Sequence, residues 1–156
     1  MSVPSNWLRG LRRYLVVTAI ANLFWETAHL PLYTIWTDGT LRENVFAVLH
    51  CTGGDVLIAL SAWAFAILVA GRPGWPVEAT WRVAVLTVIA GFTYTLFSEW
   101  LNTTVRQSWT YSPWMPVLPG LGTGLSPAFQ WLVIPSLALW AAGRDIRRGT
   151  VPGLAP

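Results

Sequence analysis

Five ionisable side chains lie inside long apolar stretches of this chain, where a charge is costly: Glu26, His29, His50, Asp55 and Glu99. A lone charge at the centre of a membrane helix costs about 2.5 to 3.5 kcal/mol on insertion scales, so such residues mark functional sites by default. Imidazole and carboxylate groups together support two kinds of chemistry. They bind divalent metal ions, or they transfer protons to and from a substrate.

Two of these residues share one helix face in the first apolar stretch. Glu26 and His29 are spaced i, i+3, and Asn22 lies one turn before Glu26. Side chains at this spacing project from the same side of a helix. Pro31 cannot donate a hydrogen bond to the carbonyl of Thr27, which predicts a kink just after the pair.

The second and third apolar stretches supply the other three. His50 and Asp55 are five residues apart, about 140° around an ideal helix. The intervening Gly53-Gly54 pair predicts local unwinding or the close approach of another helix, and the sequence leaves open whether His50 and Asp55 converge. Glu99 shares its helix face with Asn102.

Depth in the membrane follows from the helical rise of about 1.5 Å per residue. Glu26 and Asp55 lie about 15 Å below the outer ends of their helices, the two histidines about 8 to 10 Å below, and Glu99 only a few Å below. This order predicts a polar funnel that opens outward, with carboxylates at its floor.

A divalent metal ion is the first hypothesis for this funnel. Glu-x-x-His on one helix of a bundle is the spacing found at di-iron carboxylate sites, although a complete site needs two such elements and this chain has one. We therefore predict Glu26, His29, His50 and Asp55 as ligands of a divalent metal ion whose identity the sequence does not specify. Glu99 stands at the rim or acts as a base.

Two alternatives stay open at this point. In a non-metal acid–base enzyme of isomerase, cyclase or hydrolase type, Glu26 or Asp55 donates a proton to a lipid or isoprenoid substrate, and His29 or His50 is the base. Glu99 is the third candidate catalytic residue. In a non-enzymatic membrane subunit or a small transporter, the same side chains bridge helices or pass an ion.

Four apolar stretches must position these residues: Tyr14–Trp36, Val45–Ala70, Val83–Leu101 and Gly124–Gly143. Each is near the 20 or so residues that cross about 30 Å of hydrocarbon. Short connections between the first three favour antiparallel neighbours. The sequence thus predicts an all-α integral membrane protein, with residues 1–156 forming one domain built as an up-down four-helix bundle.

Composition and charge agree with a membrane protein. The chain is 54% hydrophobic and 11% charged, against about 25% charged in soluble domains, so its expected partner is the lipid bilayer. Eight of the ten arginines lie on one side of the predicted spans, which places both termini in the cytoplasm of a multi-pass inner (plasma) membrane protein. The arginines flank apolar runs instead of forming one basic face, which argues against a nucleic-acid partner.

The connection Asn102–Pro127 differs from the others because it is rich in proline, glycine and tryptophan. Its prolines and glycines prevent a regular helix, yet it is too apolar for a solvated linker. We predict a structured outer loop between the third and fourth helices that lies on, or dips into, the outer face of the bundle; in the non-metal enzyme alternative it acts as a lid. Trp109 and Trp114 would line a ligand cavity beneath it, together with Asn22 and Asn102.

Overall fold

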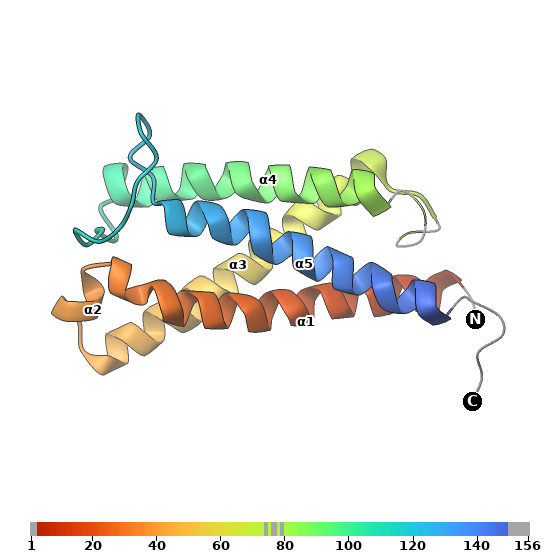
Figure 1. Cartoon of the computed structure of the whole chain (residues 1–156), viewed down its shortest axis with the longest axis horizontal. Coiled ribbons are helices and arrows are strands. Elements are labelled where there is room, and N and C mark those ends of the chain that lie inside the picture. The colour runs from red at the N-terminus through yellow and green to blue at the C-terminus, as the bar shows by residue number, and fades with distance from the viewer. Residues whose placement is uncertain (1–2, 74, 76–77, 79, 150–156) are drawn as a thin grey trace.

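Helices account for almost all of the ordered elements in this protein. The computed structural model describes residues 3–73, 75, 78 and 80–149 (Figure 1). Within these residues there are four long helices: α1 (Val3–His29), α3 (Leu41–Ala70), α4 (Thr80–Trp100) and α5 (Leu125–Gly149). Each contains a stretch that is long and apolar enough to cross a membrane. The prediction of an all-α protein with four membrane helices is confirmed.

The first predicted span is divided at its outer end. α1 stops at His29 and is followed by a 3-10 turn, η1 (Leu30–Leu32), and a short helix, α2 (Ile35–Asp38). Pro31 lies inside η1 and cannot donate to the preceding turn, and it also restricts the residue before it. The predicted helix to Trp36 was too long, because the proline breaks the helix instead of kinking it.

The second helix begins earlier than the apolar pattern indicated and runs without interruption. A capping box at Thr40 and Glu43 starts α3 at Leu41, since the Thr40 hydroxyl accepts from the Glu43 amide at 3.3 Å and the Thr40 amide donates to the Glu43 carboxylate at 2.8 Å. The local unwinding that Gly53-Gly54 permits does not occur. α3 stays helical there, and a Cβ on either glycine would meet nothing within 4 Å, so no other helix approaches closely.

The outer loop between α4 and α5 is held by backbone hydrogen bonds. α4 widens into a π-turn, η2 (Leu101–Val105), before the chain folds back. The loop then pairs with the segment after α1, where Thr34 donates to the carbonyl of Thr110 at 3.0 Å and Ser112 donates to that of Leu32 at 2.9 Å. These bonds attach the loop to the outer end of the bundle.

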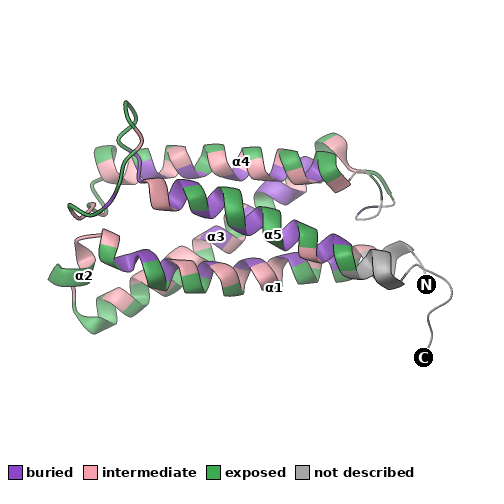
Figure 2. Cartoon of the chain, viewed as in Figure 1, coloured by how far each residue is buried: buried purple, intermediate pink, exposed green. Residues whose placement is uncertain are grey.

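Each long helix packs against two others. α1 contacts α3 and α5, and α4 contacts α3 and α5, while α3 crosses the bundle obliquely. Successive long helices run in opposite directions, so α1 begins and α5 ends at the same end of the bundle (Figure 1). The purple, buried faces in Figure 2 point toward the bundle axis.

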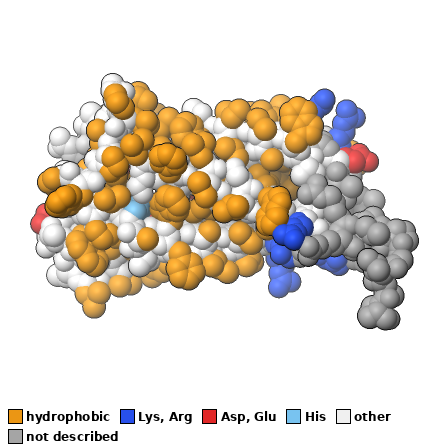
Figure 3. Space-filling model, viewed as in Figure 1, with side chains coloured by type: hydrophobic (Ala, Val, Ile, Leu, Met, Phe, Trp, Pro, Cys, Tyr) orange, Lys and Arg blue, Asp and Glu red, His pale blue; other side chains and the backbone are white. Residues whose placement is uncertain are grey.

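The two halves of the bundle differ in packing and in charge. Large rings fill the half near the start of α1, where Tyr14, Trp63 and Trp75 are buried in the apolar core. Apolar side chains also cover the outside of the helices, and arginines gather at one end of the molecule (Figure 3). An outer surface of this kind fits a lipid bilayer environment.

One glycine permits the closest contact between α4 and α5. A Cβ built on Gly91 would overlap the six-membered ring of Trp131, which is itself buried. The indole can therefore lie flat against the α4 backbone only because residue 91 has no side chain.

Gly91→Ala should lower the stability of the fold, although alanine is the better helix former. Overpacking of this kind costs about 1 to 3 kcal/mol, and the gain in helix propensity is only about 1 kcal/mol. The matched control is Gly53→Ala, whose added methyl group meets open space. We expect the midpoint of thermal unfolding in detergent to fall for Gly91→Ala and to hold or rise for Gly53→Ala. Equal midpoints would contradict the packing argument.

Candidate functional site

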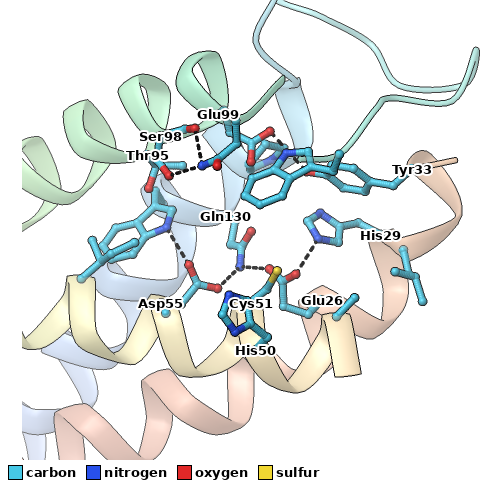
Figure 4. Close-up of a pocket in the computed structure, with 18 of the residues that line it drawn as sticks. Glu26, His29, Tyr33, His50, Cys51, Asp55, Thr95, Ser98, Glu99 and Gln130 are labelled. Atoms are coloured by element: carbon cyan, nitrogen blue, oxygen red, sulfur yellow. Dashed lines mark hydrogen bonds and ion pairs between the residues drawn. The ribbon is translucent and has the colours of Figure 1, made fainter. Parts of the chain in front are cut away.

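All five ionisable residues that the sequence singles out line one cavity of about 400 Å³ between the helices (Figure 4). Glu26 and His29 come from α1, His50 and Asp55 from α3, and Glu99 from α4. Asn102 and Trp109 line the same cavity. The tertiary structure thus brings residues from three helices and the outer loop to one space.

Gln130 of α5 connects the acids at the floor of the cavity. Its side-chain amide nitrogen donates to Glu26 Oε1 at 2.8 Å, Asp55 Oδ2 at 2.9 Å and Asn22 Oδ1 at 2.8 Å. Because both carboxylate oxygens bond the same nitrogen, they are no more than about 6 Å apart, close enough for each charge to affect the other. Figure 4 shows Gln130 between the two acids.

Sequence reasoning missed Gln130, although it left a signal. A single amide within the apolar fourth span is itself a costly residue, and it is 2% exposed in the structure. Asn22 lies behind this floor as an acceptor and is not part of the cavity wall.

A chain of hydrogen bonds extends from Glu26 away from the floor. His29 Nε2 lies 3.1 Å from Glu26 Oε2, and His29 Nδ1 lies 2.8 Å from the hydroxyl of Ser126. The Trp25 indole donates to the same hydroxyl at 3.2 Å. Ser126 is therefore free to donate its own proton to Nδ1, which leaves Nε2 as the donor to Glu26.

Asp55 of α3 is held by two side chains of α5. Its Oδ1 accepts from the Trp131 indole at 3.3 Å, while its Oδ2 accepts from Gln130. Trp131 is the ring that packs on Gly91, so the contact between α4 and α5 also sets the position of this acid.

Two tyrosines that the sequence analysis missed hold Glu99 on the opposite wall. The Tyr111 hydroxyl donates to Glu99, and that of Tyr33 donates at 3.4 Å. The Tyr111 hydroxyl also accepts from the Gly124 amide at 2.9 Å, which ties both ends of the outer loop to the acid. Burial raises the pKa of the Tyr33 hydroxyl well above its ordinary value of 10.0, and Glu99 raises it further. The same two causes raise the pKa of Tyr111.

Two polar atoms in the cavity wall are buried and have no hydrogen-bond partner among the described residues. They are the Thr95 hydroxyl, on a residue that is 6% exposed, and the Trp109 indole nitrogen. Buried polar groups are rarely left unpaired, and each such group needs an explanation. Since both lie in the cavity wall, a bound molecule with polar atoms would satisfy them.

The cavity opens sideways between α3 and α4. Four lining residues are also exposed at the surface and form what we call the mouth: His50, Leu57, Tyr94 and Arg106. Leu57 is 66% exposed and Tyr94 is 51% exposed, and each lies near the middle of a membrane-spanning stretch. In a bilayer, side chains at this depth would face lipid tails.

The four metal ligands predicted from the sequence are not gathered into one group. In the described part of the chain there is no set of three or more His, Cys, Asp or Glu side chains that could hold a metal ion. His50 stands at the mouth, where its ring stacks on Phe46 with centroids 5.4 Å apart. The unbroken helix at Gly53-Gly54 gives no rotation that would carry His50 toward Asp55.

The two tryptophans predicted for the cavity have different positions. Trp109 is in the wall, whereas Trp114 is 81% exposed and lies outside the cavity.

Comparisons with protein-family models, with curated proteins and with solved structures find no match for this chain.

Tyr33 and Tyr111 should resist ionisation in alkaline solution. Their raised pKa values favour the neutral phenols in the fold, so the stability they contribute is complete below about pH 10 and is lost as the pH rises through the higher folded values. In an alkaline titration followed by tyrosinate absorbance, the Tyr33→Phe/Tyr111→Phe double variant and the wild-type protein should therefore give the same signal near pH 10. A loss of two tyrosines' signal there would contradict the expected burial.

Proposed function

We propose that this protein is an intramembrane acid–base enzyme that transfers protons to and from a lipid or isoprenoid substrate, in a reaction of isomerase, cyclase or hydrolase type. The observation that carries the proposal is the pair of carboxyl groups joined by Gln130 at the floor of a cavity that opens sideways at bilayer depth. Glu26 and Asp55 are the proton donors, and Glu99 is the acid of the opposite wall.

The pairing of Glu26 with Asp55 supports a role in proton donation. Two carboxyl groups this close repel each other when both are charged, which favours a proton shared between them. Gln130 has two N–H bonds for three acceptor oxygens, and a carboxyl proton supplies the hydrogen bond that the amide cannot. A substrate above the floor meets an acid that is ready to donate.

His29 completes the set as the partner that returns the proton. It is bonded to Ser126 through Nδ1 and to Glu26 through Nε2, so a proton taken up at Nδ1 can leave from Nε2 to Glu26 without movement of the backbone. His50 at the mouth is the second candidate base, and its ring has room to move.

The side opening supports a substrate that stays in the membrane. A molecule with an apolar tail can pass between α3 and α4 and leave its tail against Leu57 among the lipids. Its polar end then lies near the unpartnered Thr95 hydroxyl. Along this path the apolar tail stays among lipid tails and the polar head stays among polar groups.

The arginine distribution supports an orientation for the site. Arginines gather at the end of the bundle where α1 begins, opposite the cavity (Figure 3). By the positive-inside rule this end faces the cytoplasm, both termini are cytoplasmic, and the cavity lies in the outer half of the inner (plasma) membrane.

Loss of either floor acid should abolish proton transfer. Purified protein incubated with a lipid extract in heavy water should introduce deuterium into one lipid class, as mass spectrometry would detect. Glu26→Gln and Asp55→Asn should slow this exchange by about 100-fold or more, the usual contribution of a general acid or base. The matched control is Glu78→Gln, which removes an exposed acid at the other end of the bundle. Exchange that persists in both floor variants would refute the proposal.

Metal content distinguishes the proposal from the metal site predicted from the sequence. We expect chelation to leave deuterium exchange and thermal stability unchanged, because Glu26 and Asp55 are already hydrogen-bonded by protein donors. About one metal ion per purified chain, lost in both His29→Ala and His50→Ala, would establish the metal site instead. A membrane subunit or transporter would show neither exchange nor metal.

A further inference from the structure

We infer that this cavity binds a head group most tightly when the head group carries a positive charge, as in a long-chain amine. The inference rests on the proposed proton transfer and names the class of molecule that the site takes. The charges of the wall, the unpartnered hydroxyl and the aromatic rings each support it.

The cavity wall holds three acids, and of these Glu26 contacts a side chain that can carry a positive charge, His29. In the part of the chain that the structure describes, the other two contact only neutral donors. Asp55 accepts from Gln130 and Trp131, which are neutral donors. Glu99 likewise accepts from two tyrosine hydroxyls. Among the described lining residues the only arginine is Arg106, which is exposed at the mouth. A phosphate or carboxylate head would meet like charges here, whereas an ammonium head supplies the missing partner.

The remaining wall groups also suit a cation. The Thr95 hydroxyl, buried and without a partner in the described structure, can accept a hydrogen bond from an ammonium group. The rings of Tyr33, Trp109 and Trp131 line the same space, and the faces of aromatic rings attract cations. Gln130 and the carboxyl pair lie across the cavity from Thr95 in Figure 4, so a head group between them meets acceptors on both sides.

Proton transfer itself creates this charge. When a floor carboxyl protonates a neutral substrate, its O–H bond breaks, a new bond to hydrogen forms on the substrate, and a cation stands beside the new carboxylate. Loss of a neighbouring proton to His29 or His50 then gives a neutral product, and the imidazole returns the proton to the acid. A stable ammonium compound resembles the charged intermediate and should bind more tightly than a neutral analogue.

Cys51 provides a direct readout of occupancy. It is the only cysteine in the chain, and it lines the cavity. The probes are dodecyldimethylamine, dodecanol and dodecanoate in uncharged detergent at neutral pH, and the measurement is the rate at which N-ethylmaleimide modifies Cys51. We expect the amine to protect Cys51 at concentrations about tenfold or more below those of the alcohol, and dodecanoate to protect least. The midpoint of thermal unfolding should rise in the same order and serves as a second readout.

Matched variants separate charge from shape. Asp55→Asn and Glu99→Gln should each weaken protection by the amine about tenfold and leave that by dodecanol unchanged, while Glu78→Gln should change neither. Gly54→Leu adds a side chain to the cavity wall and should block all three probes. Gly53→Leu is the matched control, because it adds the same side chain outside the cavity. Both glycines have open space beside them.

Equal protection by the amine and the alcohol, or equal effects of Glu78→Gln and Asp55→Asn, would overturn the inference. The deuterium exchange experiment reports separately on the proposed function. Exchange that needs Glu26, without a preference for the amine, would refute only the cationic head group. Protection by the amine in a protein that neither exchanges deuterium nor hydrolyses lipid would show a binding protein instead of an enzyme.

Discussion

The hydrogen bonds from the Gln130 amide to Glu26 and Asp55 are the constraint on which the outer half of this protein depends. Carboxyl groups inside a bilayer need protein partners, because neither lipid tails nor water can supply them there. One amide from α5 meets this need for acids on α1 and α3 together. The same bonds therefore hold three helices in register and bring two acids close enough to share a proton. Structural stability and the proposed chemistry come from one set of contacts.

Trp131 connects these hydrogen-bonded acids to the packing of the rest of the bundle. Its indole donates to Asp55, and its ring packs against the bare backbone at Gly91 of α4. The half of the bundle near the arginines is filled by large rings, whereas the outer half keeps a cavity of about 400 Å³. A packed half resists distortion and fixes the helices that carry the site.

The outer loop acts on the site through Glu99. Tyr111 joins this acid to Gly124 at the start of α5, and backbone bonds tie the loop to the segment after α1. Proline and glycine keep the loop out of a helix, so its backbone groups find partners across the bundle instead. Tyrosine hydroxyls in this position supply neutral donors to a buried acid. The loop is thereby part of the wall of the cavity as well as its cover.

The sequence by itself determined the membrane class, the four helices and the identity of the five costly residues, because these follow from local hydropathy and from spacing along single helices. It also carried signals that were not used, namely the capping box before Leu41 and the lone amide at Gln130. Only the tertiary structure decided which residues meet. Whether His50 reaches Asp55 depends on the unbroken course of α3, and whether Tyr33 and Tyr111 hold Glu99 depends on how the loop packs against α1 and α4. Where the cavity opens depends on how the helices cross. Crossing angles arise from the packing of side chains on several helices at once, and no single stretch of sequence contains that information.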